Sequence, residues 1–167
     1  GVHVLLDNER IAPWEVTDGL VVIEAEAFAT MERPVEKYPW RITSAIPDSV
    51  GGRAINVKEH GAGWYSSSQP PVKVTYPVTV PAAGTYTLWS RRYAPGDRSD
   101  SVYVAVDGLQ VGGDHDNSGP FPRLWHWAEY ATLNLPAGES TLEIWYREDG
   151  LYIDRLVLAS DPAYVPE

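Results

Sequence analysis

The chain has 167 residues, of which 44% are hydrophobic and 22% charged, which suits one globular domain and leaves little room for two. Its net charge of −10 and its lack of cysteine argue against general binding to nucleic acid or anionic membranes, and exclude disulfides and thiolate metal sites. No stretch approaches the about 18 apolar residues of a membrane span. The 7 Trp and 10 Tyr against 2 Phe suit surfaces that stack on sugars, and equally the core of a β-sandwich.

The first 19 residues are expected to form an arm or linker that can pack on the edge of the domain. They begin GVHVLLDNER, which has neither the basic nor the apolar region of a secretion signal. We therefore expect any signal to lie upstream, and the chain to be a module of a longer secreted or cell-surface protein.

The rest of the chain alternates between apolar and polar residues in short runs, with Gly or Pro between them and no sustained 3.6-residue apolar period. This pattern predicts an all-β sandwich or barrel over residues 20–160, followed by a tail at 161–167. The predicted strands are 20–28, 38–44, 53–58, 72–80, 85–93, 101–107, 124–135, 140–147 and 150–158, of which 38–44 has the weakest pattern.

The first of these strands, VVIEAEAF at 21–28, carries two glutamates two positions apart. Alternation along a strand would place Glu24 and Glu26 on one face, about 6–7 Å apart along the backbone. Like charges so close repel unless a positive group lies between them. The pair therefore marks either a solvated face or a cation site that needs a third oxygen ligand.

Two segments about fifty residues apart resemble each other: PVTVPAAGTYTLWSR at 77–91 and TLNLPAGESTLEIWYR at 132–147. Each reads as a strand, a Pro-Ala-Gly turn and a returning strand that begins at Gly84 or Gly138. Two such predicted hairpins suit a pair of facing antiparallel sheets.

The last strand, LYIDRLVLAS at 150–159, contains one acid, Asp154, among mostly apolar residues. A buried carboxylate needs a partner, which could be Arg155, a backbone donor or a metal ion. If the first and last strands are neighbours, Asp154 can join Glu24 and Glu26 as a third hard oxygen ligand, which favours calcium. Zinc is disfavoured, because the chain has no cysteine and its four histidines show no ligand spacing.

Five features occur in order over residues 20–160: IEAE, VPAAGTYTL followed by arginine, a Trp-rich strand, an LPAG turn and a final strand with an aspartate. This ordered set resembles the carbohydrate-binding modules of families 6 and 35. The resemblance implies a β-sandwich of jelly-roll type with two antiparallel sheets and a structural calcium. It implies that Glu24, Glu26 and Asp154 hold the calcium, with a backbone carbonyl expected from Arg53.

The same resemblance implies a non-catalytic, monomeric module that binds a polysaccharide or oligosaccharide and targets an appended polysaccharide-degrading enzyme to it. The residues agree that the chain is not an enzyme. No G-x-S-x-G motif is present, Ser66–Ser68 have no assigned base although His60 is near in sequence, and no pair of carboxylates is placed for glycoside hydrolysis. The alternative is a structural sandwich that packs on a neighbouring domain without binding glycan.

In these families the ligand cleft lies in the loops at one end of the sandwich and contains a pair of aromatic residues. One member is expected from EKYPW, as Tyr38 or Trp40, and the other from PFPRLWHW, as Trp125 or Trp127. An aromatic ring stacks on the CH face of a sugar while polar groups fix its hydroxyls.

The loop before the last strand usually supplies an asparagine in the family, but this chain has Glu148 and Asp149 there. This departure changes the family's hydrogen-bond pattern for a neutral sugar, for which Glu148 or Asp149 is expected to accept the hydroxyl hydrogens. Trp64 and Tyr65 in GAGWYSSS form either a further stacking platform or a plug for their loop.

Arginine side chains are expected near one rim of the cleft, and they favour an acidic glycan that contains uronic acid or sulfate. Arg91 and Arg92 point to opposite faces of their strand, so at most one of them can reach the ligand. The other members of the expected group are Arg98, Arg123 and His126. The alternative is that these side chains only neutralise nearby acids.

The stretch GGDHDNSG at 112–119 is either a second calcium loop or, more simply, a polar turn.

Overall fold

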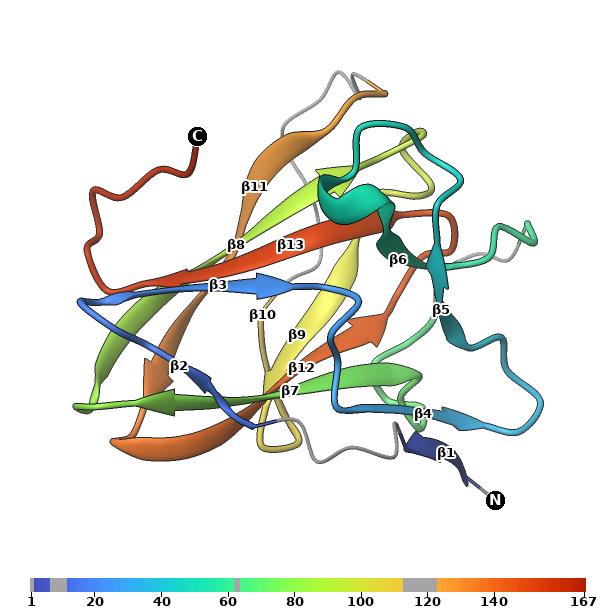
Figure 1. Ribbon diagram of the computed structural model, residues 1–167. Coiled ribbons are helices and arrows are strands. Elements are labelled where there is room, and N and C mark those ends of the chain that lie inside the picture. The colour runs from blue at the N-terminus through green and yellow to red at the C-terminus, as the bar shows by residue number, and fades with distance from the viewer. Residues whose placement is uncertain (1, 7–11, 62–63, 113–122) are drawn as a thin grey trace.

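The computed structural model describes residues 2–6, 12–61, 64–112 and 123–167, and they form the predicted all-β sandwich of two facing sheets (Figure 1). The GGDHDNSG stretch lies mostly outside the described residues. No helix within the described ranges is long and apolar enough to cross a membrane.

The larger sheet has the strand order β1-β4-β7-β12-β9-β10, and β2 also pairs with β7. Its strands are β1 (Val2–Leu6), β2 (Trp14–Glu15), β4 (Thr30–Pro34), β7 (Lys73–Val80), β9 (Val102–Val106), β10 (Leu109–Gly112) and β12 (Gly138–Tyr146). The β2–β7 pair is parallel, and the other described pairs of this sheet are antiparallel. The N-terminal stretch thus contributes two strands, β1 and β2, to this sheet.

The smaller sheet has the order β11-β8-β13-β6-β5, and β3 also pairs with β13. Its strands are β3 (Leu20–Glu24), β5 (Trp40–Thr43), β6 (Ala54–Val57), β8 (Gly84–Tyr93), β11 (His126–Leu135) and β13 (Tyr152–Ala159), and the short 3₁₀ turn η1 (Val50–Gly52) precedes β6. The first and last predicted strands are therefore neighbours, because β3 lies antiparallel to β13 with Glu24 opposite Arg155.

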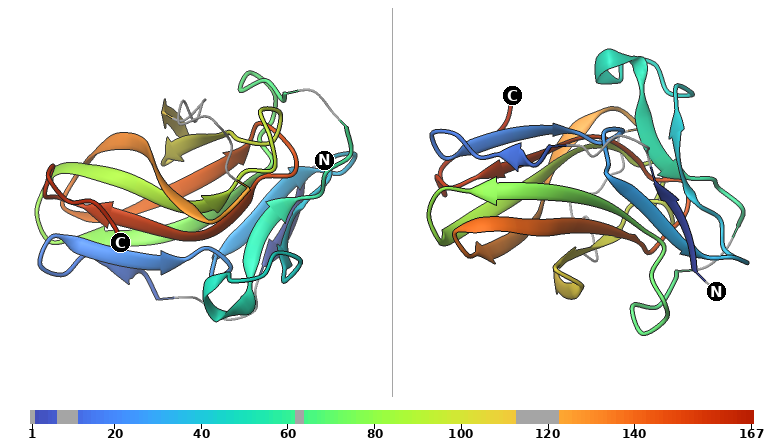
Figure 2. Two further views of the ribbon diagram at one scale, coloured as in Figure 1. Left: turned by 90° about the horizontal axis from the view of Figure 1, so that it is seen from above. Right: turned by 60° about the horizontal axis from the view of Figure 1, so that its bottom comes forward.

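The core lies between the sheets, where the inward residues of both layers meet (Figure 2). Alternation along each strand sends apolar side chains such as Ile23, Leu88 and Ile144 inward, and all three are fully buried. Two core aromatics bond their polar groups to the backbone. The hydroxyl of Tyr76 donates to the Ala25 carbonyl at 2.6 Å, and Trp40 Nε1 donates to the Val72 carbonyl at 3.1 Å.

The two Pro-Ala-Gly segments are not hairpins, contrary to the prediction. Each turn carries the chain from one sheet to the other: β7 and β12 lie in the larger sheet, and β8 and β11 lie in the smaller one. We call these connections arches. The arches stack on each other, because β7 pairs with β12 while β8 pairs with β11. The sequence similarity therefore reflects equivalent crossings between two layers about 10 Å apart.

The predicted strand 20–28 is also shorter than expected. Regular β3 ends at Glu24, the Ala25 amide donates to the Asp154 carbonyl at 2.9 Å, and the Ala27 amide then closes a turn onto the Glu24 carbonyl at 3.0 Å. Glu26 thus lies in a turn, and the two glutamates do not share one strand face. The chain continues into β4, which the sequence pattern did not predict.

Candidate functional site

Glu24, Glu26 and Asp154 meet where β3 ends beside β13, next to η1. Burial raises the pKa of Glu26, and the neighbouring charges of Glu24 and Asp154 raise it further, while the Arg53 guanidinium acts in the opposite direction. Arg53 Nε lies 3.7 Å from Glu26 Oε1. The turn at 50–52 is close as well, since a side chain added at Gly51 would come within 3.9 Å of that same oxygen.

Two arginines already occupy much of this acidic cluster. Arg155 pairs with both oxygens of Glu24, at 2.7 and 3.2 Å. Asp154 Oδ2 accepts hydrogen bonds from the Val50 amide, at 2.9 Å, and from Arg91. By contrast, Glu26 Oε2 and Asp154 Oδ1 are buried and have no hydrogen-bond partner among the described residues.

The cluster therefore fits a cation in part. Two buried oxygens without donors are what a bound cation would satisfy, but Glu24 can serve as a ligand only if it leaves Arg155. As they stand, no three acidic or histidine side chains in the described part of the chain are grouped closely enough to hold a metal. Where Arg53 was expected to offer its backbone carbonyl, its guanidinium faces Glu26.

A second group of predicted residues lies in the loops at one end of the sandwich. Tyr38, from the β4–β5 connection, is 50% exposed, and its ring centroid lies 4.3 Å from that of His60 in the β6–β7 connection. Tyr65 follows in the same connection, with Tyr146 of β12 beneath it at 5.3 Å. Trp64 beside it is 63% exposed. We call Tyr38, His60, Trp64 and Tyr65 the aromatic loop surface.

Two cations stand beside these rings. Lys37 Nζ lies 5.2 Å from the centroid of Tyr65, and the guanidinium carbon of Arg147 lies 5.8 Å from the centroid of Trp64. Tyr103 donates its hydroxyl to the Tyr65 carbonyl at 3.0 Å, which anchors the loop. From the sequence, Trp64 and Tyr65 were predicted to form either a stacking platform or a loop plug, and neither His60 nor Lys37 was predicted to contact a ligand. The Gly-flanked aromatic pair in GAGWYSSS was the signal that could have found this surface.

Glu148 and Asp149 lie next to this surface, but both act inside the protein. Asp149 is buried, and its Oδ2 accepts the His60 amide at 2.6 Å and lies 2.9 Å from His60 Nδ1. Glu148 Oε2 accepts the Ser101 hydroxyl at 2.5 Å and the Asp100 amide at 3.3 Å. The two carboxylates thus hold three loops together, and we correct their predicted role as free acceptors for sugar hydroxyls.

The proximity of His60 to Asp149 does not extend to a catalytic triad. Ser66 and Ser68 hydrogen-bond to each other at 2.8 Å. His60 Nδ1 contacts the Lys58 carbonyl at 2.7 Å as well as Asp149. In the described part of the chain, no hydrogen bond joins His60 to either serine, so no activated nucleophile is formed here.

A hollow of about 400 Å³ lies elsewhere, between the loop at 46–48, the end of β8 and the segment that leads into β11. It is lined by Ile46, Pro47, Asp48, Arg91, Tyr93, Arg123, Leu124 and Trp125, and we call it the Trp125 hollow. Trp125 and Arg91, both predicted ligand residues, meet here: the guanidinium carbon of Arg91 lies 5.2 Å from the Trp125 ring centroid.

The remaining predicted residues lie apart from both places. Trp40 is only 3% exposed and Arg92 is fully buried, so neither can contact a ligand as predicted. Arg92 donates to the Asp100 carbonyl and lies 5.5 Å from the Tyr130 ring centroid. Trp127 donates its Nε1 to the Glu167 carbonyl at 3.1 Å, beside the C-terminus. The expected arginine group is therefore dispersed: Arg92 is in the interior, Arg91 and Arg123 line the Trp125 hollow, and Arg98 is exposed outside it.

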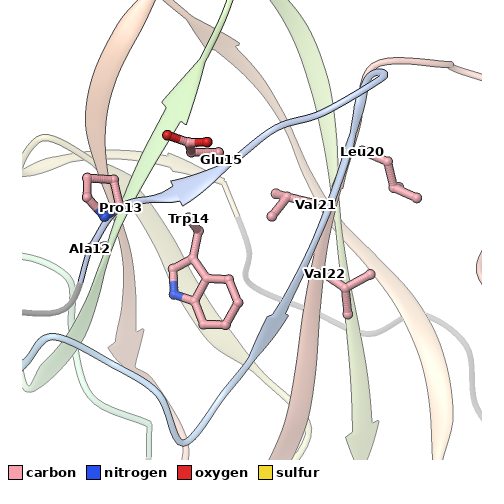
Figure 3. Close-up of a pocket in the computed structure, with 7 residues that line it drawn as sticks. All are labelled: Ala12, Pro13, Trp14, Glu15, Leu20, Val21 and Val22. Atoms are coloured by element: carbon pink, nitrogen blue, oxygen red, sulfur yellow. The ribbon is translucent and has the colours of Figure 1, made fainter.

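A larger, open groove of about 750 Å³ runs between β2 and β3 at the edge of the sandwich. Figure 3 shows the Trp14 ring extending from β2 toward β3, where Val21 points to it. Among the residues that line it, Glu15 is the one charged side chain. The groove therefore lacks the convergent polar groups that orient a sugar.

Comparisons with known proteins agree with this architecture. No protein-family model and no curated protein matches the sequence. A β-(1,4)-mannanase from Podospora anserina that carries a family 35 module matches with TM-score 0.64 and 18% identity, over 90% of this chain and 29% of that one. A family 35 module from Clostridium thermocellum matches with TM-score 0.59 and 19% identity, over 83% and 96%. The C-terminal family 6 module of LamC from Zobellia galactanivorans matches with TM-score 0.56 and 18% identity, over 84% and 98%.

The chain thus has the β-sandwich fold of family 35 and family 6 carbohydrate-binding modules, and the resemblance seen in the sequence is confirmed at the level of the fold. It spans nearly the whole length of the two isolated modules, but less than a third of the mannanase.

Proposed function

We propose that the chain is a non-catalytic carbohydrate-binding module whose glycan lies on the aromatic loop surface. The observation that carries this proposal is the exposure of Tyr38 and Trp64 on adjacent loops, with His60 and Tyr65 between them. Rings held open to solvent in this way can stack on the CH faces of a sugar. The buried Asp149 and the partly buried Glu148 hold the loops in position, which reduces the entropy lost on binding.

Polar groups beside the rings would orient the glycan. The Tyr38 hydroxyl has no hydrogen-bond partner in the described structure, and Lys37 and Arg147 bring two positive charges to the same surface. These groups donate hydrogen bonds to hydroxyl or carboxylate oxygens. They support the expectation that the glycan can carry uronic acid or sulfate.

The finer role follows from the architecture of a similar protein. The Podospora anserina match is a mannanase in which a family 35 module is joined to an enzyme domain. By analogy, we propose that this module targets a polysaccharide-degrading enzyme to its substrate, in a secreted or cell-surface protein. As an isolated domain, we propose that it is monomeric.

We also propose a structural calcium at the Glu24, Glu26 and Asp154 cluster. One buried oxygen of Glu26 and one of Asp154 accept no hydrogen bond within the described residues, and these two oxygens support this assignment. The ion would bridge the end of β3 to β13 and the turn before β6, and would supply no chemistry to a ligand at the aromatic loop surface.

Affinity gel electrophoresis on a panel of neutral and acidic polysaccharides tests the proposed function. We expect retardation of the protein by at least one glycan, and loss of that retardation when the free oligosaccharide is added. Migration unchanged on every gel would instead support the alternative, a sandwich that only packs on a neighbouring domain.

A further inference from the structure

The groove between β2 and β3 has the properties of a docking site for a peptide rather than for a sugar. It has a volume of about 750 Å³ and lies open at the edge of the sandwich (Figure 3). Apart from Glu15, the residues that line it are apolar. The half-buried ring of Trp14 extends across it toward β3. The groove shares no residue with the aromatic loop surface.

One side of the groove is a strand edge that is paired on its other side only. Among the described strands, β3 pairs with β13 alone. The Gly19 carbonyl accepts the Ser160 amide at 2.8 Å, and the Ala25 amide donates to the Asp154 carbonyl at 2.9 Å. Backbone groups of an antiparallel strand face the partner at every second residue. Val22 lies at an odd distance from both Gly19 and Ala25, so its backbone groups face away from β13.

This outer edge is closed at both ends and free in the middle. Leu20 exchanges two hydrogen bonds with Thr17, at 3.0 and 3.1 Å, and the Glu24 carbonyl accepts the Ala27 amide at 3.0 Å. Between them, the amide and the carbonyl of Val22 have no hydrogen-bond partner within the described residues. An unpaired edge of this kind is where an extended peptide can add as a further strand.

The side chains beside this edge would receive those of an added strand. Val21 points toward the Trp14 ring (Figure 3), whereas Val22 points to the other face of the sheet and is 40% exposed. Side chains of an added strand alternate in the same way as those of β3. One set would therefore lie against Trp14 and Val21, and apolar residues in that set would cover the groove.

The rim of the groove is acidic, which favours one kind of partner. Glu15 in β2, Asp18 in the turn before β3 and Asp161 after β13 are all exposed. In the described part of the chain none of the three forms an ion pair, and Arg155 of β13 is already paired with Glu24. These charges attract a segment that carries lysine or arginine. They oppose a second copy of this chain, which would bring the same acids together.

We propose that this edge is a docking surface for an extended, basic peptide segment of a partner protein, which adds to β3 as a strand. The backbone of the peptide would bond to Val22, and alternate apolar side chains would cover Trp14 and Val21. Its lysine or arginine side chains would lie near Glu15 and Asp18. The surface goes beyond the proposed function and does not depend on glycan binding.

Hydrogen exchange of the backbone amides, followed by nuclear magnetic resonance, tests the proposal. The probes are the peptides acetyl-KLKVKLK-amide and acetyl-ELEVELE-amide, which share an alternating apolar pattern and differ in the sign of their charge. We expect the basic peptide to slow exchange of the Val22 amide at least about tenfold at saturation, because its backbone accepts that hydrogen. The acidic peptide should have no such effect. Protection of Val22 without peptide that grows with protein concentration would overturn the proposal in favour of a second copy.

A reversal of charge separates docking in the groove from general attraction to a protein of net charge −10. Glu15→Lys should weaken the basic peptide at least about threefold and strengthen the acidic one. Glu129→Lys makes the same change at an exposed position of β11 and is the matched control, which should bind the basic peptide as the wild type does.

Val22→Pro removes the outward amide, which the sheet itself does not use, and edge strands accept proline at such a position. This variant should lose the basic peptide, and its thermal unfolding shows that it is folded. Glu15→Lys decides the question by itself where the proline destabilises β3. The proposal is overturned if the basic peptide leaves Val22 exchange unchanged, if Glu129→Lys weakens it as much as Glu15→Lys does, or if folded Val22→Pro binds it fully.

Discussion

At the scale of single residues, Asp100 links the loops beneath the aromatic loop surface to the pH of the solution. It is 4% exposed, and in the described part of the chain its Oδ1 has no hydrogen-bond partner. Burial, followed by the hydrogen bond and charge of Glu148, raises the pKa of Asp100 to about 7. The pKa of Glu148 is lowered by hydrogen bonds from Asp100 and Ser101, against the effect of its own burial. At mildly acidic pH the pair therefore shares one proton.

The first prediction concerns this proton. Unfolded Asp100 titrates near 3.8 and folded Asp100 at about 7, so between these values the folded state binds more protons than the unfolded state. The free energy of unfolding should therefore fall as pH rises from about 4 to about 7. The pKa of Glu148 is lowered from 4.5, so its titration changes the free energy of unfolding only below pH 4.5, outside this range.

Asp100→Asn keeps a hydrogen-bond donor toward Glu148 and cannot titrate. Urea unfolding at a series of pH values should show a smaller decline for this variant than for the wild type. Asp97→Asn, at an exposed position in the same loop, is the control. Equal slopes in the wild type and Asp100→Asn would contradict the assignment of the proton to this pair.

The second prediction concerns the acidic cluster. At a calcium concentration of about 100 times the dissociation constant, the module should gain about 2.7 kcal/mol of stability, or about 5–10 °C in melting temperature. Glu26→Gln should lose most of this gain, because Glu26 supplies an unpartnered buried oxygen. Glu129→Gln, on the exposed side of β11, should keep it. Differential scanning calorimetry with calcium or with a chelator measures the shift, and identical wild-type curves would refute a structural calcium.

At the scale of elements, the arches determine how the two sheets are joined. Gly138 begins β12 with φ of +99°, a conformation that side chains rarely adopt, whereas Gly84 begins β8 without a positive φ. The two glycines occupy equivalent places in the sequence repeat. They therefore provide a matched pair of substitutions.

The third prediction is that Gly138→Ala destabilises the module by about 1–3 kcal/mol through backbone strain. Gly84→Ala should be neutral or slightly stabilising, within about 1 kcal/mol, since its new side chain would meet only the Tyr86 ring at an ordinary 3.8 Å. Denaturant unfolding of both variants gives the comparison. An equal loss at both positions would mean that φ does not distinguish the arches.

Much of the strand pattern could be predicted from the sequence, because alternation depends only on which face of each strand is buried. The sheet to which a strand belongs could not: a Pro-Ala-Gly turn looks the same whether it closes a hairpin or crosses between layers. The end of β3 at Glu24 was missed for a similar reason, since AEAF continues the alternation through a turn. The short strands β1, β2, β4 and β10 have too few alternating residues to stand out.

For the candidate site, the sequence predicted the kinds of residue and the loops better than the individual residues. The sequence identified the loops that carry Tyr38 and Trp125, but it could not show which of Tyr38 and Trp40 is exposed. Trp40 is buried because its strand pairs with β6 and its side chain bonds to the 72–73 segment. The hydrogen-bond partners of Asp149 could not be predicted from the sequence either, since His60 lies 89 positions away in the chain. Contacts of that kind depend on how the loops fold over one another.

At the scale of the whole molecule, the sandwich carries its proposed and candidate sites at separate places. The acidic cluster lies at the junction of β3 and β13, the Trp125 hollow beside the end of β8, and the aromatic loop surface on the β4–β5 and β6–β7 connections. Arg91 joins the first two, because it pairs with Asp154 and stacks on Trp125. The aromatic loop surface shares no residue with either, so glycan binding there should persist when the metal is removed.

The measurement that tests the central claim most directly is isothermal titration calorimetry of a glycan that retards the module in gels, with wild type, Trp64→Ala and Trp127→Ala. Trp127 is a matched control, since it lies by the C-terminus and donates to Glu167. We predict that Trp64→Ala weakens binding at least about tenfold through loss of a stacked ring, while Trp127→Ala binds as the wild type does. Full affinity in Trp64→Ala together with a loss in Trp127→Ala would contradict the account and place the glycan beside the C-terminus instead.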